Sequence, residues 1–262
     1  MRRLSLILLA CLALASLPAA AVTIGTSQNL GAVPATSGSG LLGYYYKFNS
    51  SNNIGNLATA NQLISSSGGP TATFTTTQIC FPDCAGNSIS DSSTMTQFLN
   101  GHASNFSYTS TNQPSAIDHS AIVLNGFIAI TRTGTYNFNL GSDDGSQLTI
   151  GGTQVINNDS DHGFSFAGGD ATFTQTGLYA ISITYFEDSG STGLALFAKD
   201  PTGSCVIGRA ANCAAGSAAT GLLYSSLPST PTPEPASLLL FGAGLGGLAA
   251  VAWVRRKSHR AI

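Results

Sequence analysis

The chain has 262 residues, of which only 8% are charged, and its formal net charge at pH 7 is −2. Six of its ten Lys and Arg residues lie at the two ends, so the middle keeps four basic residues against eleven acids that precede the tail. Because binding to phosphate needs a basic face, this balance excludes nucleic acid as a partner and suits calcium or neutral sugars better.

A secretory signal peptide is predicted over residues 1–21. Two arginines open the chain, an apolar stretch runs from Leu4 to Leu17, and small residues follow it. We expect cleavage near Ala20 or Ala21, which would export the remainder of the chain. The alternative is a buried N-terminal helix, but the long polar stretch that follows favours the signal peptide.

The sequence predicts a linker over residues 22–39, which are rich in Ser and Thr, and a single domain over residues 40–227. Helix formers are scarce in this domain, and only Met95–Leu99 suggests a short helix. Apolar and aromatic runs separated by Gly- and Asn-rich turns predict strands. The predicted strands are Leu42–Phe48, Ala121–Thr131, Tyr136–Leu140, Gln147–Ile150, Ala171–Phe173, Tyr179–Tyr185 and Leu194–Ala198.

Short strands at close spacing are typical of an all-β fold, here an antiparallel β-sandwich. About 200 residues suffice for one such domain with its own core. Alternation in the segment 179–185 places four side chains on one face, which predicts that they pack in the core. These residues are Tyr179, Ile181, Ile183 and Tyr185.

Four cysteines lie outside the signal peptide in two close pairs, Cys80 with Cys84 and Cys205 with Cys213. An even count in an exported chain predicts disulfides. Two local loops are the preferred connectivity, and a cross-link between the pairs is the alternative. A zinc site is disfavoured, because neither pair has the two-residue spacing of zinc ligands and the histidines are scattered.

Residues 134–161 carry the pattern most informative about chemistry. A predicted strand runs into Asp143 and Asp144, followed by Gly145 and a second strand. Neighbouring carboxylates repel each other unless a cation or hydrogen-bond donors neutralise them, and calcium takes oxygen ligands. The pattern is therefore either a calcium site or a solvated turn in which Asp143 accepts backbone hydrogen bonds.

Several blocks of the sequence resemble the PA14 domain, a family that is named after anthrax protective antigen and also occurs in yeast flocculins and glycosidases. They appear in the family's order, with Asp-Asp-Gly at the centre, and span roughly residues 40–227. The blocks are Gly40–Tyr45, Gly134–Phe138, Ser142–Leu148, Gly177–Ile181, Tyr185–Glu187 and Gly221–Tyr224.

The resemblance implies a β-sandwich that binds glycans in its adhesin members. In those members two aspartates joined by a cis peptide hold calcium, and calcium holds sugar hydroxyls. Carried over, Asp143 and Asp144 would be the calcium ligands. The adhesins often complete the site with an Asn from a later loop, but here residues 187–193 lack Asn, so we expect Asp188 or Ser189 to substitute.

A neighbouring loop carries further candidate ligand-binding residues. They either line the site or cap turns: Asn157, Asp159, Asp161 and His162. The domain contains no tryptophan, since Trp253 lies in the tail. Stacking against a sugar would therefore have to use Tyr or Phe.

The C-terminal tail predicts a membrane helix after a Pro-rich linker at 228–235. Within residues 236–262, the stretch from Ala236 to Val254 has no charge and would span roughly 28 Å as a helix. A basic cluster follows and is expected to stay cytoplasmic, which places the domain outside the membrane.

The same tail resembles the PEP-CTERM sorting domain. The resemblance rests on the Pro-Glu-Pro motif, the glycine-containing apolar helix and the basic cluster, which comprise Pro233, Glu234, Pro235, Arg255, Arg256 and Lys257. It implies recognition by an exosortase, processing near Pro-Glu-Pro, and a Gram-negative source that makes exopolysaccharide. The helix would then be a temporary membrane contact, and a permanent anchor is the alternative.

Three functions remain open. The first is a calcium-assisted module that binds glycan or exopolysaccharide at the cell surface or in the biofilm matrix. The second is a structural matrix protein whose sandwich is only a spacer. The third, an extracellular hydrolase, is disfavoured, because neighbouring residues such as Glu187 and Asp188 point to opposite faces of a strand and cannot readily flank one bond. We therefore expect the protein not to be an enzyme.

Overall fold

The computed structural model describes residues 20–111, 113–208 and 221–227. The predicted signal peptide, apart from its last two residues, lies outside this part of the chain, as do Cys213, Pro233, Glu234, Pro235, Arg255, Arg256, Lys257 and the predicted membrane helix. None of the helices in the described residues is long and apolar enough to cross a membrane. The described residues up to Ser226 belong to one compact unit, which contains the β-sandwich.

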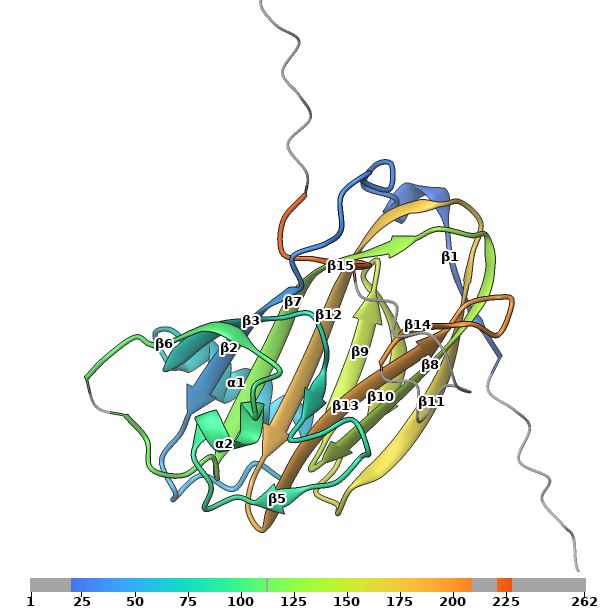
Figure 1. Cartoon of the computed structure of the whole chain (residues 1–262). Helices are drawn as coiled ribbons and strands as arrows, with labels where there is room; N and C mark the ends of the chain where they lie inside the picture. The colour runs from blue at the N-terminus through green and yellow to red at the C-terminus, as the bar shows by residue number, and fades with distance from the viewer. Residues whose placement is uncertain (1–19, 112, 209–220, 228–262) are drawn as a thin grey trace, which may run out of the picture. The chain divides into compact units, whose positions relative to one another are not determined.

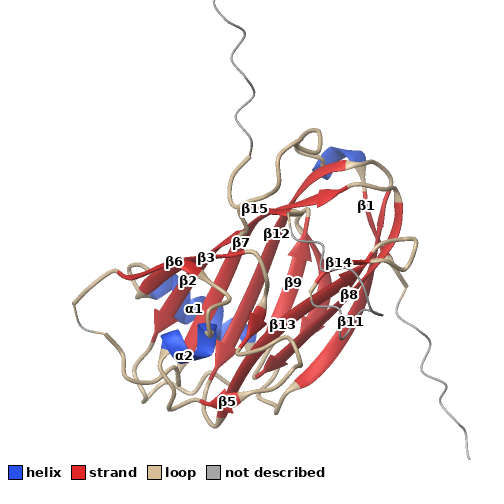
Figure 2. Ribbon diagram, viewed as in Figure 1, coloured by secondary structure: helices blue, strands red, loops and turns tan. Residues whose placement is uncertain are grey.

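Two β-sheets form this unit (Figures 1 and 2). Along the first sheet the order is β1 (Val22–Ile24), β11 (Ser165–Phe173), β8 (Gly134–Asp143), β13 (Ser191–Lys199) and β14 (Cys205–Ile207), with β4 (Cys80–Phe81) and β5 (Ile89–Ser90) also on β13. Along the second the order is β10 (Thr153–Asn158), β9 (Ser146–Ile150), β12 (Gly177–Glu187), β7 (Ser120–Ile130), β2 (Leu41–Lys47), β3 (Ala72–Thr76) and β6 (Ser104–Tyr108), with β15 (Leu223–Tyr224) also on β7.

The prediction of an antiparallel β-sandwich is confirmed. Among the described strands every pairing is antiparallel except that of β1 with β11. The two longest strands, β7 and β12, pair from Gly177 opposite Ile130 to Glu187 opposite Ser120. The four alternating side chains of β12 predicted to face the core are at most 2% exposed, and they join one cluster with apolar residues of both sheets.

The seven predicted strands all occur, with ends shifted by a few residues. The short helix α2 (Met95–Leu99) is also present, and Thr94 and Gln97 form its capping box. The sequence did not predict the helix α1 (Leu57–Ser66), because its apolar pattern is short: Leu57 and Ala60 are buried, Leu63 and Ile64 are partly buried, and the other residues are small or polar. This helix packs on the outer face of the second sheet, where it meets Ala121 of β7 and Phe186 of β12.

The linker predicted over residues 22–39 is wrong for its first part. Residues Val22 to Ile24 form β1, which pairs in parallel with Ala171 to Phe173. The side chain of Ile24 is fully buried in the main core, and the amide of Leu30 donates to the carbonyl of Leu178 at 2.8 Å. The strand could not be recognised from the local sequence, because its pairing partners lie about 150 residues away.

Replacing Ile24 with alanine is expected to lower the free energy of unfolding by about 2–4 kcal/mol, because it leaves a cavity in the core. Urea unfolding of the full chain measures the effect. Leu30→Ala is the matched control, since Leu30 is 47% exposed, and its effect should stay within about 0.5 kcal/mol. Equal effects of the two changes would show that β1 does not contribute to the core.

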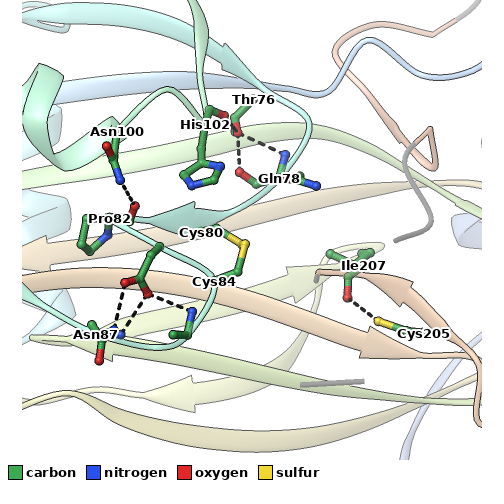
Figure 3. Close-up of a disulfide and its surroundings, with 12 residues drawn as sticks. Thr76, Gln78, Cys80, Pro82, Cys84, Asn87, Asn100, His102, Cys205 and Ile207 are labelled. Atoms are coloured by element: carbon green, nitrogen blue, oxygen red, sulfur yellow. Dashed lines mark hydrogen bonds between the residues drawn. A yellow bond between two sulfur atoms is a disulfide. The ribbon is translucent and has the colours of Figure 1, made fainter. Parts of the chain in front are cut away.

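The disulfide between Cys80 and Cys84 is present, which excludes this pair as zinc ligands (Figure 3). Cys205 is also disulfide-bonded, and its predicted partner lies outside the described residues. The Cys80–Cys84 loop is held further by Asn100, whose side-chain amide donates to the carbonyl of Pro82 at 2.9 Å. These contacts fix the chain that leads from β4 to Ser88, beside the candidate site.

Candidate functional site

The paired aspartates lie at one end of the sandwich, where β8 turns into β9. Asp143 is the last residue of β8, and Gly193 of β13 lies opposite it. The peptide bond between Asp143 and Asp144 is cis, as the resemblance to the PA14 family implied. The end of β12 and the loop from Asp188 to Gly190 complete this end of the sandwich.

Asp144 is held between two backbone amides. Its Oδ1 accepts from the amide of His162 at 3.1 Å, and its Oδ2 accepts from the amide of Asp188 at 2.9 Å. The residue is only 2% exposed. Burial, together with the neighbouring carboxyl of Asp161, raises the pKa of Asp144 to about 7.

Asp143 is directed toward the outer face of the first sheet. It is 5% exposed, and burial raises the pKa of Asp143 above its usual value, although hydrogen bonds from the Ser88 side chain and the Phe164 amide oppose that rise. Ser88 follows the disulfide loop, and Phe164 immediately precedes β11. Asp143 is thus enclosed by segments from both sides of β8.

Glu187 is a third buried acid, which we did not predict as part of the site. Its side chain is fully buried, and its Oε1 has no hydrogen-bond partner among the described residues. Burial first, and then the charge of Asp144, raise the pKa of Glu187 to about 10. The alternation from Tyr179 to Tyr185 continues to Glu187, so the same period-two pattern could have placed this carboxyl on the core side.

Tyr185 connects Glu187 to the paired aspartates. Its hydroxyl donates to the backbone carbonyl of Asp143 at 2.6 Å and lies 3.1 Å from Oε2 of Glu187 and 2.6 Å from the hydroxyl of Thr192. Since the tyrosine has one proton, a protonated Glu187 can donate to the tyrosine oxygen. This network supports the Asp143 peptide from the core side.

The carboxylate of Asp188, a predicted metal ligand, has other partners. Its Oδ1 accepts from the amide of Ile54 at 2.8 Å, and its Oδ2 accepts from the Asn53 side chain at 3.4 Å. His119 Nε2 lies 4.0 Å from the same carboxylate. The backbone amide of Asp188, rather than its side chain, reaches Asp144, and Ser189 is exposed in the following loop.

The four candidates in the neighbouring loop have different positions. Asp159 accepts from the amide of Leu57 at 2.7 Å and so caps α1, while the amide of His162 and the carboxyl of Asp161 reach Asp144. Asn157 is exposed on β10, opposite Gln147. The structure therefore brings His162 and Asp161 to the aspartates, and gives Asp159 a capping role.

Two protein families match parts of the chain. The profile of the PA14 domain matches residues 95–204, and that of the PEP-CTERM protein-sorting motif matches residues 231–257. The chain carries a PA14 domain and a PEP-CTERM sorting motif. The PA14 match includes the cis aspartates, Glu187 and Asp188.

Solved PA14 domains have the same fold. The PA14 domain of the MpAFP antifreeze protein is 21% identical with a TM-score of 0.56, and the match covers 77% of this chain and 98% of that one. A PA14 sugar-binding domain from an RTX adhesin is 24% identical with a TM-score of 0.54, covering 64% of this chain and 94% of that one. No curated protein sequence matches the chain.

The acids of the PA14 domain fit a calcium ion in their chemistry. The ion pairs in the described residues involve Asp118, Asp188 and Asp200, so neither Asp143 nor Asp144 forms an ion pair. The charge of His162 lowers the pKa of Asp143, but burial outweighs it. Buried carboxylates without such a partner favour a hard divalent cation. In the same part of the chain no group of three or more His, Cys, Asp or Glu is arranged to hold a metal. A calcium shell would therefore need backbone, water or ligand oxygens as well.

Proposed function

We propose that the chain is an exported protein whose PA14 domain binds glycans with the help of calcium held by Asp143 and Asp144. The observation that carries this proposal is the pair of buried carboxylates, 5% and 2% exposed, that form no ion pair with a basic side chain of the described residues. A bound divalent cation would remove the electrostatic cost of keeping both residues charged.

The chain's own residues have distinct roles in this proposal. Asp143 and Asp144 supply charged oxygen ligands, and the amides of His162 and Asp188 fix the orientation of Asp144. Calcium accepts six to eight oxygens and therefore has positions left for water or sugar hydroxyls. Because two acids alone cannot complete the shell, glycan hydroxyls are suitable additional ligands.

The similar solved structures support a sugar ligand. One of them is described as a sugar-binding domain from an RTX adhesin. The acidic composition of the exported part also suits a neutral or cation-bridged glycan better than a polyanion.

The C-terminal motif supports export and sorting. We propose that an exosortase recognises the tail of residues 228–262 and processes it near Pro233 to Pro235, releasing the domain to the cell surface or the extracellular matrix of a Gram-negative bacterium. Before processing, the tail would contact the inner membrane. Permanent anchoring through the same tail is the alternative.

The positions of Glu187 and Asp188 favour binding over catalysis. Glu187 is fully buried, and the carboxylate of Asp188 is bound to the amide of Ile54. These two groups therefore cannot act on opposite sides of one glycosidic bond. A purely structural spacer remains the second candidate, since a sandwich of this size can fold without a ligand.

A glycan array probed with the full chain, with calcium or with EDTA, tests this function. We expect binding to one family of neutral glycans in calcium and loss of that binding in EDTA. The domain would be a spacer if no glycan is bound in calcium and calcium leaves the melting temperature unchanged. If EDTA leaves glycan binding intact, the proposed role of calcium is refuted, while glycan binding by the domain stands.

A further inference from the structure

Three phenylalanine rings form a small apolar surface next to Asp143. We call Phe164, Phe166 and Phe197 the phenylalanine shelf. The ring of Phe166 lies 5.3 Å from that of Phe164 and 5.6 Å from that of Phe197, centroid to centroid. Phe166 is 46% exposed, whereas Phe164 and Phe197 pack with Ala195 and the Cys80–Cys84 disulfide.

Strand register places the shelf on the same face of the sheet as Asp143. Phe166 pairs with Gly141 of β8, and Phe197 pairs with Asn139. Residues 139, 141 and 143 alternate with the core residues Leu140 and Ser142 and so face outward together. The backbone amide of Phe164 is also near enough to Asp143 to lower the pKa of that carboxyl. The shelf and the candidate calcium site are therefore continuous.

Glycines allow the rings to lie directly on the sheet. A Cβ at Gly141 would come within 2.5 Å of the Phe166 ring and 2.8 Å of the Phe164 ring, and one at Gly193 would come within 2.9 Å of Phe164. Any larger residue at these two positions would displace the rings. The shelf is thus a close-packed surface with one ring left open to solvent.

The size and the charge of this surface identify the kind of occupant. One exposed aromatic ring buries at most about 250 Å², far below the roughly 800 Å² per partner that a stable protein interface needs. The strand positions that pair at residues 139, 141 and 143 of β8 include Asp143 and Asn139 but no Lys or Arg. An apolar ring beside a hydroxyl-binding carboxylate suits a sugar, which has both C–H faces and hydroxyls.

We propose that the phenylalanine shelf is the second half of the glycan site and stacks against the C–H face of a hexopyranose whose hydroxyls are held at Asp143 and Asp144. This inference rests on the proposed function. It selects sugars with an uninterrupted C–H face, because the negative face of an aromatic ring attracts such hydrogens. Phe166 is the residue that determines this preference.

NMR titration of the full chain with methyl β-galactoside and methyl β-glucoside, in calcium, tests the proposal. We expect upfield ring-current shifts of the sugar C–H protons with the wild type. Phe166→Ala should bind about tenfold more weakly and lose these shifts, and Phe166→Tyr should retain both. Leu42→Ala, which removes an exposed apolar side chain on the other sheet, should bind like the wild type.

The outcomes separate this inference from the proposed function. If Phe166→Ala binds as tightly as the wild type, while Asp143→Asn loses binding, the shelf is not part of the site and the calcium-assisted function stands. If the wild type binds neither these probes nor any glycan of the array, both proposals fail. The calcium-induced rise in melting temperature should be the same in Phe166→Ala and the wild type, which shows that the variant is folded.

Discussion

Replacing Asp143 with asparagine is expected to abolish the stabilisation of the protein by calcium. At a calcium concentration of about 100 times Kd, binding should stabilise the wild type by about 2.7 kcal/mol. For a domain of this size that corresponds to a rise in melting temperature of roughly 5–10 °C. The variant removes one of two charged ligands and should show almost no rise when scanned by calorimetry with and without calcium.

Asparagine keeps the shape of Asp143, so the calcium-free variant should still fold. Since burial already raises the pKa of Asp143, a neutral amide should cost little at this position. Asp170→Asn is the matched control, because Asp170 lies on the neighbouring strand β11 and bonds to Asn137 at 2.7 Å. It should keep the full calcium response, and an equal response of Asp143→Asn would contradict the proposed ligand role.

The free energy of unfolding of the calcium-free protein is expected to fall as pH rises from about 5 to 8. The pKa of Glu187 is raised in the folded state from 4.5 to about 10, so the folded protein binds more protons than the unfolded chain between these values. Below pH 4.5 the full contribution of Glu187 to the free energy of unfolding is present. Above pH 4.5 this contribution falls by up to about 1.4 kcal/mol per pH unit. Asp144, whose pKa is raised to about 7, adds to the loss in the lower part of the range.

Urea unfolding of the Glu187→Gln variant over this pH range isolates the effect. The variant should be more stable than the wild type at pH 8, with a flatter profile, because the amide carries no charge to bury. Asp200→Asn should keep the wild-type slope, since hydrogen bonds from Thr202 and Ser204 outweigh burial and lower the pKa of Asp200 below this range. An unchanged slope in Glu187→Gln would show that this acid is not the source of the pH dependence.

The sequence predicts the long, regular parts of the fold well, because their pattern is local. Alternation in β12 identifies the residues that face the core, and the apolar run of β7 identifies its partner strand. Strand β1 and helix α1 could not be found in this way. The first is three residues long and gains its stability from a partner distant in sequence, and the second buries only Leu57 and Ala60.

The candidate site was predictable in its centre but not in its surroundings. The adjacency of Asp143 and Asp144 is a property of the sequence, and the resemblance to PA14 domains supplied the cis peptide that the structure has. Which atoms surround them depends on how loops meet at the end of the sandwich. Composition alone cannot show that Asp188 turns its carboxylate to Ile54, or that Glu187 is buried without a partner for Oε1.

A crystal structure of the protein grown in calcium tests the central claim most directly. We predict an ion about 2.3–2.6 Å from carboxylate oxygens of both Asp143 and Asp144, with Glu187 still buried behind them. Density for water alone at this end of the sandwich, in crystals that contain calcium, would contradict the proposed site.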